Sequence, residues 1–157
     1  MNIKILHIII LFLSLKCYSQ HSEKFISLTS ILKPSDSITV DLKFSNGNQK
    51  EIAKIYEYEL GDYVYSYYYG KRIEYYRDGS IAYEYEYNDY GILLSCKWFD
   101  GHDNLWRESQ TLKIDSDAKN SKEFLQKEKH LTITINEKIY RYDNNKCEYY
   151  MKKEDLF

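Results

Sequence analysis

The sequence predicts an all-β (β-rich) protein, an antiparallel β-meander with one or two short helices. Eighteen of its 157 residues are tyrosine, and most lie between Tyr56 and Tyr90, where aromatic residues alternate with charged ones. Alternation with period two indicates strands that each bury one face. Short polar–glycine pairs such as Asp78-Gly79 and Asp100-Gly101 interrupt these runs, as hairpin turns do. A closed β-barrel or sandwich is the alternative, because long meanders often close to remove their edges.

Residues 1–19 are expected to be a signal peptide. Lys4 precedes an apolar stretch over 5–15, and Cys17-Tyr18-Ser19 places small residues at the −3 and −1 positions of a cut before Gln20. Such a segment is too short to remain as a spanning helix; an uncleaved membrane anchor is the alternative. The protein is therefore expected to be exported to the periplasm, cell envelope or medium. Residues 20–157 would form a single β-rich domain with no integral membrane segment.

The first half of this domain is expected to begin with a short helix over 21–32, which Pro34 ends. Asn46-Gly47 then lies between two alternating runs and predicts a hairpin, because both residues tolerate positive φ. Leu60-Gly61-Asp62 and Gly70-Lys71 are expected to reverse the chain twice more. The strands expected in this half are 38–44, 51–58, 63–69, 73–75 and 83–87.

The second half is expected to continue the meander. Its predicted strands are 92–98 and 105–114, followed by a short helix within 115–129 with Ser121 as its N-cap. C-terminal hairpins over 130–152 complete the chain. They consist of a strand over 131–135, a turn over 136–138, a strand over 139–142, a turn over 143–146 and a strand over 147–151.

Two cysteines, Cys96 and Cys147, follow the predicted cleavage site. In an exported protein they are candidates for one disulfide, which would stabilise the fold by about 3–5 kcal/mol. Two independent buried thiols are the alternative, and the spacing matches no zinc pattern. The formal net charge of −2 offers no basic footprint, so nucleic acid is not an expected partner.

The turns belong to a repeated unit. Phe44-Ser45-Asn46-Gly47 aligns with Tyr76-Arg77-Asp78-Gly79, and both align with Phe99-Asp100-Gly101, which omits one spacer. In this alignment Gly79 and Gly101 mark successive units, and Tyr90-Gly91 is the half-period turn between them.

This pattern resembles the bacterial variant of MORN repeats over about residues 44–106. The chain departs from that family because it lacks the regular second glycine, and because the interval from Gly47 to Gly79 is too long. The resemblance implies an elongated, curved sheet of paired strands. It also implies protein–protein interaction or scaffolding, with an antitoxin or immunity role in some bacterial members.

No catalytic, metal or cofactor site is expected. His21, His102 and His130 show no metal-ligand spacing, and no nucleotide-binding glycine pattern occurs. A Cys–His nucleophile built on Cys96 is the weaker alternative to a structural cysteine. Glu84 and Glu86 share a strand face and are spaced as in an inverting glycosidase, but any Glu-x-Glu strand has that spacing. The chain is therefore expected not to be an enzyme.

The tyrosines carry the functional expectation. They either pack against each other across strands or form an exposed platform, and one sheet of this size hides one face only. The expected function is non-enzymatic binding of a partner protein through an aromatic-rich sheet face; the alternative is an envelope glycan-binding module that uses Tyr and Trp stacking. The candidate binding residues are Tyr65, Tyr67, Tyr69, Tyr83, Tyr85, Tyr87, Trp98 and Trp106.

Overall fold

The computed structural model describes residues 22–126, 130–143 and 148–151, with the side chains of 142–150 left out of the description. The predicted signal peptide and Cys147 lie outside the described residues. The chain divides into two compact units. We call Met1–Ile31 with Leu112–Thr134 the helical unit, and Leu32–Thr111 with Ile135–Phe157 the meander unit.

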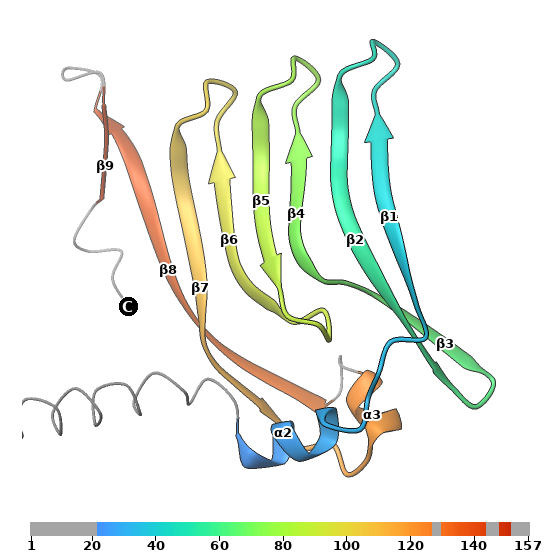
Figure 1. Ribbon diagram of the computed structural model, residues 1–157. Coiled ribbons are helices and arrows are strands. Elements are labelled where there is room, and N and C mark those ends of the chain that lie inside the picture. The colour runs from blue at the N-terminus through green and yellow to red at the C-terminus, as the bar shows by residue number, and fades with distance from the viewer. Residues whose placement is uncertain (1–21, 127–129, 144–147, 152–157) are drawn as a thin grey trace, which may run out of the picture. The chain divides into compact units, whose positions relative to one another are not determined.

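The described strands form one open antiparallel sheet, which confirms the predicted fold class (Figure 1). The strand order is β1-β2-β4-β5-β6-β7-β8-β9, with β3 paired to β2. Because β1 and β9 end this order without meeting, the described sheet is not the closed barrel of the alternative. The strands are β1 Asp36–Lys43, β2 Gln49–Leu60, β3 Tyr63–Tyr68, β4 Gly70–Tyr75, β5 Ile81–Tyr87, β6 Leu93–Phe99, β7 Leu105–Ser116, β8 Leu131–Asp143 and β9 Glu148–Met151.

Four turns of the meander unit share one backbone pattern, at 44–48, 76–80, 88–92 and 100–104. In each, the first residue donates to the carbonyl of the fifth, and the fourth donates to the carbonyl of the first. The fourth residue has positive φ: Gly47 +89°, Gly79 +102°, Gly91 +66° and Asp103 +60°. This is a three-residue loop, a type I turn closed by a left-handed residue. In the first turn only Gly47 adopts a positive φ, and Asn46 does not.

The repeat alignment needs one correction. Asp103, rather than Gly101, takes the left-handed position in the third unit. Asp100 accounts for the shift, since its Oδ1 accepts hydrogen bonds from the backbone N–H groups of His102 and Asn104. Asp-Gly therefore starts this turn, whereas it closes the turn at 76–80.

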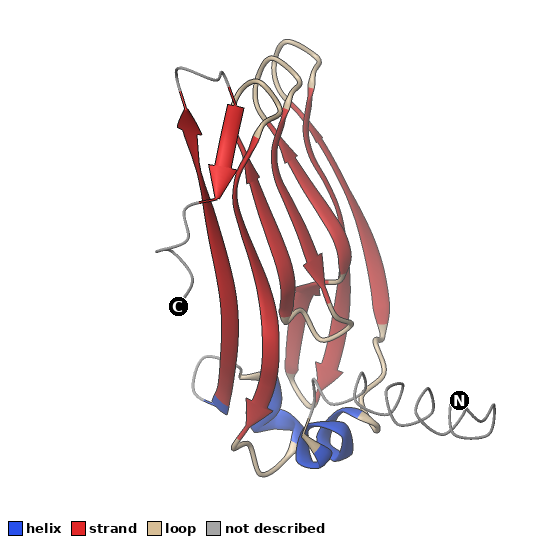
Figure 2. Ribbon diagram, turned by 90° about the vertical axis from the view of Figure 1, so that its left-hand side faces the viewer, coloured by secondary structure: helices blue, strands red, loops and turns tan. Residues whose placement is uncertain are grey.

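Side chains connect the three turns that lie at one end of the strands (Figure 2). Asn46 and Asn48 both donate to the Arg77 carbonyl, at 2.9 and 3.0 Å. The Tyr76 hydroxyl donates to the Phe99 carbonyl at 2.9 Å. Asp103 Oδ1 accepts from the N–H of Ile81 at 3.0 Å. Each turn is thus bonded to the next turn along the sheet.

The predicted turn at Gly70-Lys71 is wrong. β3 pairs with β2 over Ile55–Leu60, and β4 pairs with the same strand at Glu51 and Ile52. The chain therefore keeps its direction through Gly70, whose φ of +60° allows a local kink. Tyr69 N–H donates to the Lys54 carbonyl at this kink. The interval from Gly47 to Gly79 is long because it contains the additional hairpin formed by β2 and β3.

The helical unit contains two short helices, α2 (Glu23–Thr29) and α3 (Ser121–Leu125). Phe25 and Phe124 meet edge to face at 5.4 Å between ring centroids, and both are buried. The N-cap of α3 is Asn120, whose side chain accepts from the N–H of Glu123, so the Ser121 prediction is off by one residue. No helix in the described residues has the length and apolar character to cross a membrane.

The C-terminal prediction is partly wrong. No turn interrupts the chain at 136–138, because β8 runs without a break through these residues. The hairpin of β8 with β9 is present and pairs Tyr140 with Met151.

Candidate functional site

Strand register assigns the side chains of the meander unit to two faces. One row of directly opposed residues crosses β2, β4, β5, β6 and β7, and the next row crosses β4 to β7. We call the face that these rows share, together with the residues whose rings contact it, the tyrosine–arginine face. It comprises Glu51, Tyr68, Arg72, Glu74, Tyr83, Tyr85, Tyr87, Cys96, Trp98, Arg107 and Ser109.

Successive strand residues point to opposite faces, so the intervening residues form the polar face. Its two rows are also directly opposed across the strands. They consist of Ile52, Ile73, Glu84, Lys97 and Glu108, and of Lys71, Glu86, Ser95 and Gln110.

The register divides the predicted aromatic platform. Tyr83, Tyr85, Tyr87 and Trp98 lie on the tyrosine–arginine face. Tyr65 and Tyr67 pair with Tyr58 and Tyr56, which places them on the opposite side of the sheet. Tyr69 stacks on Tyr56, which places it on that side as well. Trp106 lies at a register shift between β6 and β7, so the register assigns it to neither face. The eight candidates therefore do not form one surface.

Arg72 lies at the centre of the tyrosine–arginine face, and the sequence prediction missed it. Its Nε donates to Glu51 Oε1 at 2.8 Å, and its NH2 group lies 2.7 Å from Glu74 Oε1. The guanidinium is also 4.2 Å from the ring centroid of Tyr68 and 5.1 Å from that of Tyr85. Burial acts to lower the pKa of Arg72, but these carboxylates and nearby Tyr87 outweigh it and raise the pKa.

The tyrosines of β5 form a ladder along the strand. Tyr83 and Tyr85 have ring centroids 5.8 Å apart at 20°, and Tyr85 and Tyr87 are 6.0 Å apart at 28°. Tyr68 extends the ladder, with its ring 5.8 Å from that of Tyr87. These separations are close to the spacing of residues two apart on a strand, so the rings stand upright and face one another.

The β6 and β7 part of this face carries a second stacked arginine. Arg107 lies 4.7 Å from the centroid of the Trp98 ring, and its Nε donates to Glu137 Oε1 at 2.8 Å. Cys96 lies in the same face with 0% exposure. Burial raises the pKa of its thiol to about 12, so the thiol is protonated and not activated as a nucleophile. Cys96 has no disulfide among the described residues, and its bond to Cys147 stays a prediction.

A second aromatic cluster surrounds Tyr58 on the other side of the sheet. Tyr58 is only 1% exposed, and its hydroxyl donates to the Asp89 carbonyl at 2.7 Å. The rings of Tyr56, Tyr67 and Tyr90 lie 6.2–6.4 Å from the Tyr58 ring. This cluster packs the β2–β3 hairpin against the turn at 88–92. Its tyrosines therefore have a core role, which is the packing alternative of the sequence analysis.

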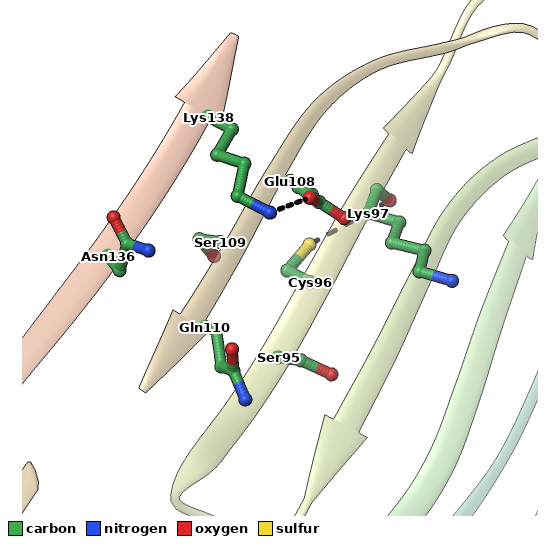
Figure 3. Close-up of a pocket in the computed structure, with 8 residues that line it drawn as sticks. All are labelled: Ser95, Cys96, Lys97, Glu108, Ser109, Gln110, Asn136 and Lys138. Carbon is green, nitrogen blue, oxygen red and sulfur yellow. Dashed lines mark hydrogen bonds and ion pairs between the residues drawn. The ribbon is translucent and has the colours of Figure 1, made fainter. Parts of the chain in front are cut away.

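A polar cleft of about 250 Å³ lies on the polar face between β6, β7 and β8 (Figure 3). Glu108 accepts from Lys138 Nζ at 2.8 Å and from the Tyr140 hydroxyl at 3.0 Å. Ser95, Gln110 and Asn136 supply hydroxyl and amide groups to the lining. A shallower cleft of about 230 Å³ adjoins it through Ser95 and Lys97. Together they offer hydrogen-bonding groups rather than an apolar pocket.

Two of the candidate catalytic groups, Glu84 and His130, have polar partners, whereas Glu86 and His102 are exposed. Glu84 lies 3.1 Å from Lys71 Nζ. His130 Nδ1 lies 2.9 Å from Asp117 Oδ1 within the helical unit. The described residues contain no cluster of three or more metal-ligating side chains. Comparisons of the chain with protein-family models, with curated proteins and with solved structures found no match.

Proposed function

We propose that the protein is an exported, non-enzymatic interaction protein that binds a partner protein through the tyrosine–arginine face. The observation that supports this most is the upright tyrosine ladder beside Arg72 and Arg107. Tyrosine, tryptophan and arginine are the residue types that dominate protein-binding hot spots. The immunity-type version of the proposal, in which the partner is a toxin delivered to the periplasm, rests on the repeat resemblance.

Ring orientation favours a protein partner over sugar stacking on this face. The Tyr85 ring has Tyr83 on one side and Tyr87 on the other. Sugar stacking needs an uncovered ring face, which the interior of such a ladder does not supply. Upright rings expose edges and hydroxyl groups, which suit hydrogen bonds and apolar contacts with a protein surface.

The second candidate is a glycan-binding module, and the polar cleft is the observation that favours it. Hydroxyl, amide and charged groups from Ser95, Gln110, Asn136 and Lys138 converge there. A carbohydrate would therefore be held on the polar face, by hydrogen bonds rather than by the tyrosine ladder.

Two adjacent substitutions separate the candidates. Tyr83→Ala changes the tyrosine–arginine face, and Glu84→Ala, the next residue on β5, changes the polar face. Affinity capture from an envelope fraction should recover a stoichiometric protein with the wild type and with Glu84→Ala. Tyr83→Ala should weaken binding of that protein about thirtyfold, a hot-spot loss of about 2 kcal/mol.

Thermal unfolding of both variants checks that the fold persists. Retention on polysaccharide that persists in Tyr83→Ala and is lost in Gln110→Ala, which changes the polar cleft, would favour the glycan candidate and overturn the first. Turnover of any envelope substrate that Glu84→Gln abolishes would overturn the non-enzymatic assignment.

A further inference from the structure

Strand β1 presents a free edge. In the described sheet it pairs with β2 alone. All of its side chains except Val40 are exposed. Two of these are large and apolar, Ile38 at 42% and Leu42 at 45% exposure. An unprotected edge of this kind pairs readily with another strand.

Hydrogen bonds show which backbone groups of β1 point outward. Phe44 N–H donates to the Asn48 carbonyl, and the Leu42 carbonyl accepts from the Gln49 side chain. Even-numbered residues of β1 therefore point toward β2. On β2, the Lys54 carbonyl accepts from Tyr69 and so points away from β1. Thr39, the partner of Lys54 on β1, therefore points its backbone groups away from β2, in agreement with this assignment. Backbone groups alternate along a strand, so the odd-numbered residues of β1 offer N–H and C=O to the outside.

The β1 sequence complements itself in one antiparallel register. With Val40 opposite Val40 of a second copy, the outward residues form hydrogen-bonded pairs of Thr39 with Asp41 and of Ser37 with Lys43. Each such pair supplies two backbone hydrogen bonds. Centring the pairing on Asp41 would oppose two like charges, which destabilises a sheet.

The apolar side chains match in this register as well. Ile38 lies opposite Leu42 of the second copy, and Leu42 lies opposite Ile38. Centring the pairing on Thr39 instead would set the Asp36 carboxylate against Leu42. The Val40 register is thus the one in which apolar residues meet apolar residues and no like charges meet.

We propose that β1 pairs antiparallel with β1 of a second copy of this chain, which joins two sheets into one dimer. The two-fold axis through Val40 is perpendicular to the sheet, so both tyrosine–arginine faces lie on the same side. The dimer then offers a partner two equivalent ladders. This proposal concerns the chain alone and does not depend on the proposed function.

Sedimentation velocity with light scattering tests the proposal on the purified protein. The wild type should have twice the mass of the single chain at micromolar concentration. Thr39→Pro removes an N–H that points away from β2, so it should halve the mass and leave the circular dichroism spectrum unchanged. Thr39→Val keeps the N–H group and should remain a dimer.

A second variant covers the case in which Thr39→Pro fails to fold. Ile38→Lys with Leu42→Lys changes two exposed side chains and places like charges opposite each other across the axis, so it should also give the single-chain mass. A wild type that keeps the single-chain mass up to millimolar concentration overturns the proposal. A folded Thr39→Pro or double-lysine variant that remains dimeric overturns it equally.

Discussion

The Arg72 network permits a stability prediction that can be worked out from contacts. Arg72→Met keeps an apolar side chain of similar length and removes the guanidinium. Glu51 and Glu74 then lose the charged partner that lies 2.8 and 2.7 Å from their oxygens. The Arg72 side chain is 19% exposed and that of Glu51 is 11% exposed, so water replaces the lost contacts only in part.

The expected loss is about 3 kcal/mol of unfolding free energy at neutral pH. Hydrogen bonds to charged groups contribute about 1.5–3 kcal/mol each, and a partly exposed cation–π contact contributes about 0.5–1 kcal/mol. Breaking a fully buried ion pair costs about 3–5 kcal/mol. We take the low end of that range because the network at Arg72 retains some solvent contact.

Urea unfolding followed by circular dichroism measures this loss. Lys71→Met is the matched control, since Lys71 is the preceding residue on the opposite face and its side chain is 56% exposed; its loss should be within about 0.5 kcal/mol. Adding Glu51→Gln to Arg72→Met should cost less than the sum of the single changes. An Arg72→Met loss no larger than that of Lys71→Met would refute the reasoning.

Three further outcomes are expected. Asp103→Ala should lower the unfolding free energy, measured in urea, by about 2 kcal/mol. A left-handed alanine costs about 1 kcal/mol, and the lost hydrogen bond to the Ile81 N–H costs about 1 kcal/mol more. Asp103→Gly should lose only the contribution of the hydrogen bond. Tyr58→Phe removes the hydroxyl donor of a buried ring and should lose about 1 kcal/mol, whereas an unchanged urea midpoint would contradict the assigned hydrogen bond. The hydrogen bond from Lys138 holds the pKa of Glu108 below its usual range. The stability that Glu108 contributes is therefore present above its unfolded pKa of about 4.3 and is lost as pH falls through the lower pKa of the folded state. The melting temperatures of the wild type and Glu108→Gln should differ at pH 7 and converge below about pH 4.

Local sequence signals predicted the hairpins because turn chemistry is a local property. The pairs Asn46-Gly47, Asp78-Gly79 and Tyr90-Gly91 all mark true reversals. The third unit misled the alignment, since Asp100 accepts two backbone hydrogen bonds and moves the left-handed position to Asp103. An Asp-Gly pair alone does not distinguish these two arrangements.

The candidate site was harder to predict, because it depends on which strands become neighbours. Period-two alternation placed Tyr83, Tyr85 and Tyr87 together correctly. It did not show that Tyr65 and Tyr67 lie on the other side of the sheet, because that follows from the kink at Gly70 and the shared pairing with β2. The sequence offered only Glu74, two residues along the same strand, as a partner for Arg72, because the second carboxylate, Glu51, comes from β2.

The turn-to-turn bonds have a consequence for how the sheet opens. Asn46 and Asn48 attach the first hairpin to Arg77 of the second, and Asp103 of the third attaches to Ile81. A sheet in which each hairpin bonds mainly to its neighbour behaves as a one-dimensional array. In the single-chain form that the double-lysine variant should give, amide hydrogen exchange should therefore be fastest in β1 and slow progressively toward β5. A substitution that weakens one turn should speed exchange in the hairpins between that turn and the β1 edge before it affects the other strands.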